Sequence, residues 1–129
     1  VSFAMPAKGS AGAYVGFKRC APAYPTISVG VQLSLKGEQC EDARIALGSA
    51  GLTTIHARAA EAELRGKTLT SAVLARAADA AVAECDPVDD QRGSIAFKQS
   101  IVKVLVKRGI GTAMRRCKGE AVEVSHEYY

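Results

Sequence analysis

The stretch that decides the fold is 27-ISVGVQLSLK-36, in which apolar residues alternate with polar or small ones. Successive side chains of a β-strand point to opposite faces, so this pattern predicts a strand with one buried and one polar face. Residues 36–39 (KGEQ) follow as a hairpin turn. Beyond them Ala43, Ile45 and Leu47 alternate again, which predicts a second strand returning antiparallel to the first.

A third strand is expected on the N-terminal side of this hairpin. Between Ala13 and Arg19 the sequence alternates, with Val15 and Phe17 pointing to one side. The segment 21-APAYP-25 joins this strand to the central one, and its two prolines confine it to a turn or loop. The three strands therefore predict an antiparallel sheet.

The period changes after residue 51, where helical patterns begin. A first helix is expected over about residues 54–65, because Glu61 and Arg65 form an i,i+4 pair and Gly66 suits a helix C-terminus. A second helix is expected over residues 70–85, with Thr70 as its N-cap. The apolar stripe of this second helix is predicted to comprise Leu74, Ala78, Ala81 and Cys85.

A third helix is expected to begin at the N-cap Ser94 and to fray near Gly109 and Gly111. Its predicted buried face comprises Phe97, Ile101, Val104 and Leu105. Strands followed by helices, rather than alternating with them, are typical of an α+β fold. The prediction is a three-stranded antiparallel sheet followed by a three-helix bundle packed on one face.

The chain has 129 residues, which is the size of one domain. We divide it into a lead-in linker at 1–12, which is rich in Gly, Ala, Ser and Pro, a folded domain at 13–112 and a charged tail at 113–129. Because Val1–Ala4 precede Met5, we expect the chain to begin within a longer protein. No run approaches the length of a membrane span, and no signal-peptide architecture opens the sequence.

The four cysteines are widely spaced: Cys20, Cys40, Cys85 and Cys117. This spacing argues against a zinc knuckle or an iron–sulfur loop and favours reduced thiols in a cytoplasmic protein. Two disulfides are also compatible with it, although a domain of this size does not need them.

The net charge of +4 permits steering of an anionic partner without requiring one. The C-terminal region has a basic bias that we expect on the solvent side of the third helix: Lys98, Lys103, Lys107, Arg108, Arg115, Arg116 and Lys118. No aromatic platform for stacking on bases accompanies these residues. A solvated face is therefore the favoured interpretation, with RNA or DNA binding as the minor alternative.

Motifs with catalytic potential are weak. His56 and His126 have no local partner motif, so both are interpreted as surface histidines. The loop 48-GSAG-51 could hold a phosphate, but it lacks the dinucleotide fingerprint and the phosphate-loop lysine. Three carboxylates before the third helix could bind a cation, and they more simply complement that helix's positive N-terminus: Asp86, Asp89 and Asp90. We therefore expect no complete catalytic site in this chain.

Tyr24 stands out chemically because Pro22 and Pro25 restrain the loop that presents it. A ring held in this way could cover a planar ligand by offset stacking. It could also simply plug the end of the sheet, and the pattern alone favours this second interpretation.

Several segments together resemble one known family. They occur in this order along the chain: 14-YVGFKR-19, the loop to Tyr24, residues 31–48 with 40-CEDAR-44 at their centre, 86-DP-87 followed by 92-RGS-94, and 104-VLVKR-108. The set, which spans about Ala13 to Ile110, resembles the C-terminal domain of the flavoprotein (medium) subunit of molybdenum hydroxylases, the carbon monoxide dehydrogenase and xanthine dehydrogenase group. The resemblance implies a three-stranded antiparallel sheet with a helical bundle, following a larger FAD-binding domain.

By the same resemblance, Tyr24 matches the loop tyrosine that shields one face of the flavin ring. Lys18 and Arg19 match a basic pair that precedes this loop and lies near the flavin. Pro22-Ala23 and Pro25 stand where family members often have Gly-Asp and Ala.

The implied function is that of an accessory domain, not catalytic alone, in an FAD- and molybdenum-containing oxidoreductase. FAD would be shared with the FAD-binding domain, which this chain lacks, and the iron–sulfur and molybdenum subunits would be further partners. The alternatives are a free-standing module that binds protein or nucleic acid, and a small enzyme whose site the sequence does not reveal.

Overall fold

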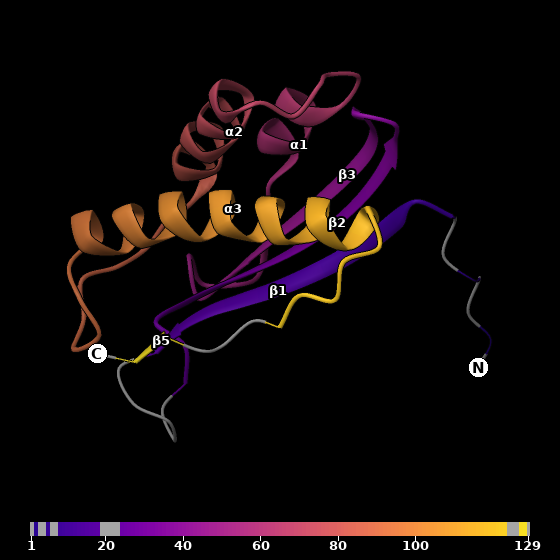
Figure 1. The fold of residues 1–129 in the computed structure, drawn as a ribbon. Coiled ribbons are helices and arrows are strands. Elements are labelled where there is room, and N and C mark those ends of the chain that lie inside the picture. The colour runs from indigo at the N-terminus through magenta and orange to yellow at the C-terminus, as the bar shows by residue number, and fades with distance from the viewer. Residues whose placement is uncertain (1, 3–4, 6–7, 19–23, 124–126, 129) are drawn as a thin grey trace.

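The computed structural model describes residues 2, 5, 8–18, 24–123 and 127–128. In it one sheet is covered on one side by helices, and its strands are ordered β4-β3-β2-β1-β5 (Figure 1). The strands are β1 (Ser10–Lys18), β2 (Ile27–Lys36), β3 (Gln39–Gly48), β4 (Ile55–His56) and β5 (Glu127–Tyr128). The helices are α1 (Arg58–Leu64), α2 (Ser71–Glu84) and α3 (Ile95–Cys117).

The predicted α+β fold and its antiparallel hairpins are confirmed. Strand β2 lies at the centre and pairs antiparallel with β1 on one side and β3 on the other. Its inward residues Ile27, Val29 and Leu33 have no exposed surface. The β2–β3 turn contains Gly37 at φ 64°, a left-handed conformation that glycine adopts without strain.

The sheet is larger than the three strands predicted from the sequence. Strand β1 begins at Ser10, within the segment predicted to be a linker. Residues 55–56, predicted as the start of a helix, form β4 instead, in which Ile55 pairs with Leu47. The Ala57 N–H then donates to the Ile45 carbonyl at 2.9 Å, so the chain remains bound to β3 until α1 begins. The result is four antiparallel strands, with the two-residue β5 added parallel to β1.

Helix α3 does not fray at its glycines, as the sequence predicted, but continues through both to Cys117. At Gly109 an added Cβ would lie 3.0 Å from Val31 Cγ2, so the absent side chain is what allows the helix to approach the sheet. Of the predicted buried face, Leu105 is buried and Ile101 is half-buried, but the prediction is wrong for Phe97 and Val104, which are 42% and 47% exposed. The face that meets the sheet comprises Lys98, Val102, Leu105, Val106, Gly109, Ile110 and Ala113.

Lys98 was predicted on the solvent side of α3, and this is wrong, because its side chain is only 3% exposed. Its Nζ donates to the Val88 carbonyl at 2.6 Å and forms an ion pair with Asp90 Oδ1 at 2.9 Å. Asp89 Oδ1 accepts a hydrogen bond from the Ile95 N–H at 2.6 Å, so a carboxylate does complement the start of α3. The predicted cap is confirmed, because Ser94 Oγ accepts from the Phe97 N–H.

The second helix follows its prediction more closely. Thr70 caps α2 by accepting a hydrogen bond from the Val73 N–H. Ala78 and Ala81 of the predicted stripe are fully buried, and α2 packs against both α1 and α3. Among the described residues, no helix has both the length and the apolar character that a membrane span requires.

The two glycines of α3 give a matched test of the contact between helix and sheet. Gly109→Val should lower the free energy of unfolding by about 1–3 kcal/mol, because the new side chain collides with buried valines. Gly111→Val adds the same side chain where nothing lies within 4 Å of the new Cβ, so helix propensity alone should raise stability by a few tenths of a kcal/mol. Urea denaturation measures both. Equal stability of the two variants would rule out the close approach at Gly109.

The ion pair of Lys98 predicts how stability responds to acid. Hydrogen bonds, first from Lys98 and then from the Arg92 N–H, lower the pKa of Asp90 below its ordinary value of 3.8. A carboxyl with a lowered folded-state pKa stabilises the fold above its unfolded pKa, and this contribution disappears as pH falls through the folded value. Asp90→Asn should therefore reduce the unfolding free energy at pH 7 and have a much smaller effect at about pH 2. A reduction of equal size at both pH values, measured by urea denaturation, would contradict this origin.

Candidate functional site

The face of the sheet opposite the helices carries small and polar residues. Large apolar side chains point toward the helices, so the alternate positions point outward. One row crosses the described strands: Tyr14 pairs with Gly30, Gly30 with Ala46, and Ala46 with His56. Two small residues thus lie between an aromatic ring and an imidazole.

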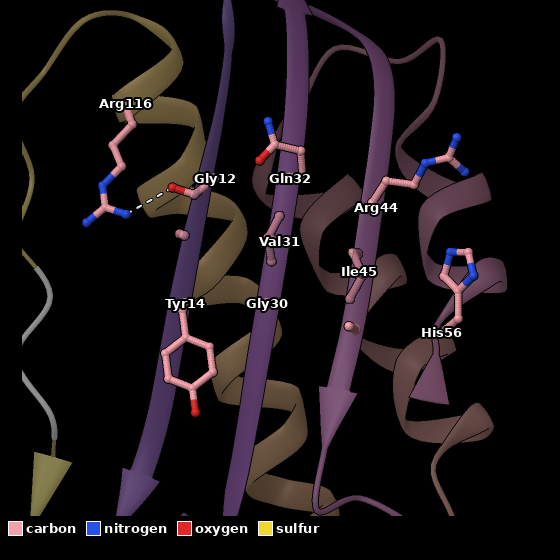
Figure 2. A pocket seen from close by; sticks show the side chains of 11 residues that line it. Gly12, Tyr14, Gly30, Val31, Gln32, Arg44, Ile45, His56 and Arg116 are labelled. Atoms are coloured by element: carbon pink, nitrogen blue, oxygen red, sulfur yellow. Dashed lines mark hydrogen bonds between the residues drawn. The ribbon is translucent and has the colours of Figure 1, made fainter. Parts of the chain in front are cut away.

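This row forms the floor and walls of an open hollow of about 530 Å³ (Figure 2). Gly30 and Ala46 make the floor, and a Cβ added to Gly30 would meet nothing within 4 Å. A glycine inside a strand often marks a place where a ligand or another backbone approaches closely. Further lining residues come from the neighbouring row and from α3: Gly12, Gln32, Arg44 and Arg116.

The charged groups around the hollow are mostly basic. Arg44 is exposed, and its nearest carboxylate, Asp42, lies 3.8 Å away and is held more closely by Arg65 at 3.0 Å. Arg116 Nη1 donates to the Gly12 carbonyl at 2.9 Å, which ties the end of α3 to β1 (Figure 2). The other guanidinium nitrogens of Arg116 donate to the Val122 carbonyl. Both arginines thus line the hollow together with the small residues of its floor.

His56 is held by a buried carboxylate. Glu61 of α1 is 1% exposed, and its Oε1 lies 2.5 Å from His56 Nε2. The same Oε1 accepts the Ile45 N–H at 2.8 Å, and Oε2 accepts from Arg65 at 3.2 Å. The predicted Glu61–Arg65 pair is confirmed. Its link to His56 could not be predicted, because only the pairing of β4 with β3 brings the histidine over α1.

A histidine fixed by a carboxylate resembles part of a catalytic triad, but the described hollow contains no serine or cysteine nucleophile. Cys40 lies in the core, and its burial raises the pKa of its thiol. Among the described residues no group of His, Cys, Asp and Glu side chains could hold a metal ion.

Two of the residues singled out from the sequence, Lys18 and Tyr24, lie at the end of the β1–β2 hairpin. Tyr24 is 79% exposed and is not among the residues that line the hollow. The Thr26 N–H donates to the Phe17 carbonyl at 2.8 Å, which closes the hairpin two residues after Tyr24. Lys18 ends β1, and the strand alternation places it on the outward face with Tyr14. Arg19 lies outside the described residues.

The loop at residues 48–51, considered above for phosphate binding, lies beside Lys98, which is already in an ion pair. Ser49 and Gly51 line a cavity of about 190 Å³ together with Lys98, Asp90 and Arg92. Asp90 neutralises the buried ammonium at 2.9 Å. Lys98 therefore has little charge left to offer to an anion.

The family model described as CO dehydrogenase flavoprotein C-terminal domain matches residues 12–113. The carbon monoxide dehydrogenase medium chain of Hydrogenophaga pseudoflava is 32% identical over 111 residues, which cover 86% of this chain and 39% of that protein. Subunit alpha of the 6-hydroxypseudooxynicotine dehydrogenase complex of Paenarthrobacter nicotinovorans is 33% identical over 88 residues, covering 68% of this chain and 30% of that protein.

Solved structures give the same result. Carbon monoxide dehydrogenase from Hydrogenophaga pseudoflava, in a form that lacks the Mo-pyranopterin moiety of its cofactor, superposes with a TM-score of 0.84 at 37% identity, covering 86% of this chain and 39% of that chain. Quinoline 2-oxidoreductase from Pseudomonas putida 86 superposes with a TM-score of 0.78 at 28% identity, covering 82% and 37%. The chain thus spans about two fifths of the length of these proteins.

Two glutamates of α1 test the role of the buried carboxylate. Glu61→Ala should lower the free energy of unfolding by about 1–3 kcal/mol, because the Ile45 N–H loses its acceptor in the core. Glu63→Ala removes the same side chain from the surface pairs with Lys67 and Arg76, so its effect should stay below about 1 kcal/mol. Urea denaturation compares them. If both variants lose the same free energy of unfolding, the buried contacts of Glu61 contribute no more than an ordinary surface ion pair.

Proposed function

Since the chain belongs to the CO dehydrogenase flavoprotein C-terminal domain family of molybdenum hydroxylase medium subunits, we propose that it covers the flavin ring in such an oxidoreductase. In this role Tyr24 lies over one face of the isoalloxazine ring, and Lys18 and Arg19 contribute positive charge beside it. The FAD-binding domain holds the rest of the nucleotide. The domain then acts in a cytoplasmic complex with iron–sulfur and molybdenum subunits.

The observation that carries this proposal is the exposure of Tyr24 at the hairpin end. Tyr24 is 79% exposed, although the chain next to it is held by the hydrogen bond from the Thr26 N–H to the Phe17 carbonyl. A ring restrained in this way loses little conformational entropy on binding, and offset stacking adds about 0.5–1.5 kcal/mol beyond the buried area. An exposed tyrosine therefore suits one wall of a planar ligand.

The described residues fit the ring of FAD but not its pyrophosphate. No glycine-rich loop with a free lysine is present among them, because Asp90 already pairs with Lys98. When bound in the assembled enzyme, FAD would supply the electron transfer between the iron–sulfur clusters and an external acceptor. This chain's residues would cover the ring and exclude water from one face. The chain alone should accordingly bind FAD weakly or not at all.

The alternative of a nucleic-acid-binding module loses support from the ion pairs of α3. Lys98 is buried, Lys103 pairs with Asp79 at 2.8 Å, and Arg115 pairs with Glu120 at 2.7 Å. These contacts interrupt the basic face that would follow a phosphate backbone. Steeply salt-dependent retention of the chain on DNA or RNA would favour this alternative.

Tyr24→Ala tests the proposed role in the assembled flavoprotein, which contains this chain and the FAD-binding domain. Loss of stacking should weaken FAD binding by about two- to tenfold and increase the fluorescence of bound flavin. Tyr24→Phe keeps the ring and should behave as the unchanged protein does. Fluorescence titration and the flavin absorption spectrum measure both effects. An unchanged spectrum and affinity in Tyr24→Ala would refute the shielding role.

A further inference from the structure

We propose that His56 forms a proton-sensitive latch at the start of α1, in which the neutral imidazole holds Arg58 and a second ring proton releases it. The latch consists of His56, which ends β4, and two side chains of α1, Arg58 and Glu61. It is independent of the flavin-shielding role, because Tyr24 belongs to the β1–β2 hairpin.

The contacts of His56 determine where its single proton lies. Arg58 Nε lies 3.3 Å from His56 Nδ1. A guanidinium can only donate, so Nδ1 accepts this hydrogen bond and carries no proton. A neutral imidazole then carries its proton on Nε2, which lies 2.5 Å from Glu61 Oε1. The hydrogen bonds therefore assign the Nε2–H tautomer to His56.

The Glu61 carboxylate accepts from His56 in both protonation states of the imidazole. Glu61 is 1% exposed, and Arg65 and the Ile45 N–H donate to its two oxygens at 3.2 and 2.8 Å. Because Nε2 carries a proton in both the neutral and the charged imidazole, its hydrogen bond to Glu61 persists. The contact that changes is the one made by Nδ1.

Protonation of Nδ1 removes the acceptor that holds Arg58. Both groups are then donors, so no hydrogen bond can form between them, and both carry a positive charge. The His56 side chain is 44% exposed, so a proton reaches Nδ1 from solvent without unfolding of the chain. Acidification should therefore free the Arg58 guanidinium while His56 stays bound to Glu61.

Charged side chains of both signs surround the latch on three elements: Glu61, Arg58 and Arg65 of α1, Arg44 and Asp42 of β3, and Glu84 of α2. Asp42 is shared between Arg44 and Arg65. Glu84 accepts the Ala59 N–H at 3.2 Å, so its carboxylate lies beside the residue that follows Arg58. The released guanidinium thus has a carboxylate within reach on α2.

The latch makes the rim of the hollow sensitive to pH. His56 lines the hollow together with Arg44 and Arg116 (Figure 2). Its protonation adds a third positive charge to this rim and turns Nδ1 from an acceptor into a donor. Histidine side chains ordinarily change charge between about pH 5 and 8, which sets the range that a titration has to cover.

Heteronuclear NMR of the ¹⁵N-labelled 129-residue chain tests the latch, because long-range correlations distinguish ring nitrogens with and without a proton. At about pH 8 His56 should carry a proton on Nε2 alone, and at about pH 5 on both nitrogens. The Arg58 Nε–H signal should shift with the same midpoint. His126→Gln removes the second histidine of the sequence and so assigns the signals of His56.

Two arginine variants separate the hydrogen bond from charge alone. Arg58→Ala removes the donor to Nδ1, so the protonation midpoint of His56 should rise by about 0.3–1 pH unit. Arg44→Ala removes an exposed charge of the same sign from β3, so its effect should be smaller and should vanish in about 1 M salt. In His56→Gln, which cannot be protonated, the Arg58 signal should stay constant over this pH range. The amide spectrum of each variant shows that it is folded.

Three results would overturn the latch. The first is a proton on Nδ1 at about pH 8, which would mean that the assigned tautomer is wrong. The second is an Arg58 signal that does not follow the titration of His56, or that titrates equally in His56→Gln. The third is an equal rise of the midpoint in Arg58→Ala and Arg44→Ala, which would leave charge as the only link between Arg58 and His56. None of these results bears on flavin binding, which Tyr24→Ala tests separately.

Discussion

Helix α3 lies against the sheet at Gly109, where a Cβ would come within 3.0 Å of Val31. Because interiors are closely packed, this approach determines which side of the helix faces inward along its whole length. At one end it buries Lys98, which binds Val88 and Asp90 and so positions the segment before the helix. At the other end it brings Arg116 to the Gly12 carbonyl and ties the helix to β1.

The same sheet presents two very different faces. Inward positions carry valine, leucine and isoleucine, whereas the outward row carries Tyr14, Gly30, Ala46 and His56. Such small outward residues add little to the stability of a central strand, where glycine costs about 0.5–1 kcal/mol relative to alanine. Their physical effect is to leave the backbone open to a close neighbour.

The sequence patterns correctly predicted the structural features that depend on local periodicity. The alternation of β2, the cap at Ser94 and the Glu61–Arg65 pair are all present. The patterns failed where tertiary contacts decide: β4 is two residues long and exists only through β3. Gly109 was interpreted as a helix breaker, since glycine disfavours helices, but packing outweighs that preference. The hollow could not be predicted, because it requires the register of four strands at once.

The absence of a catalytic constellation in the described residues follows from the way polar groups are used. Glu61 gives its oxygens to the Ile45 N–H, His56 and Arg65, so the histidine beside the hollow is held as a wall. Lys98 and Asp90 neutralise each other under the helix end. What remains accessible is an aromatic tip at Tyr24 and a shallow basic face, which are features that act by shape and charge. Tyr24 lies at the end of the β1–β2 hairpin, whereas the basic face also depends on Arg44 of β3 and Arg116 of α3, so the two features belong to different parts of the fold.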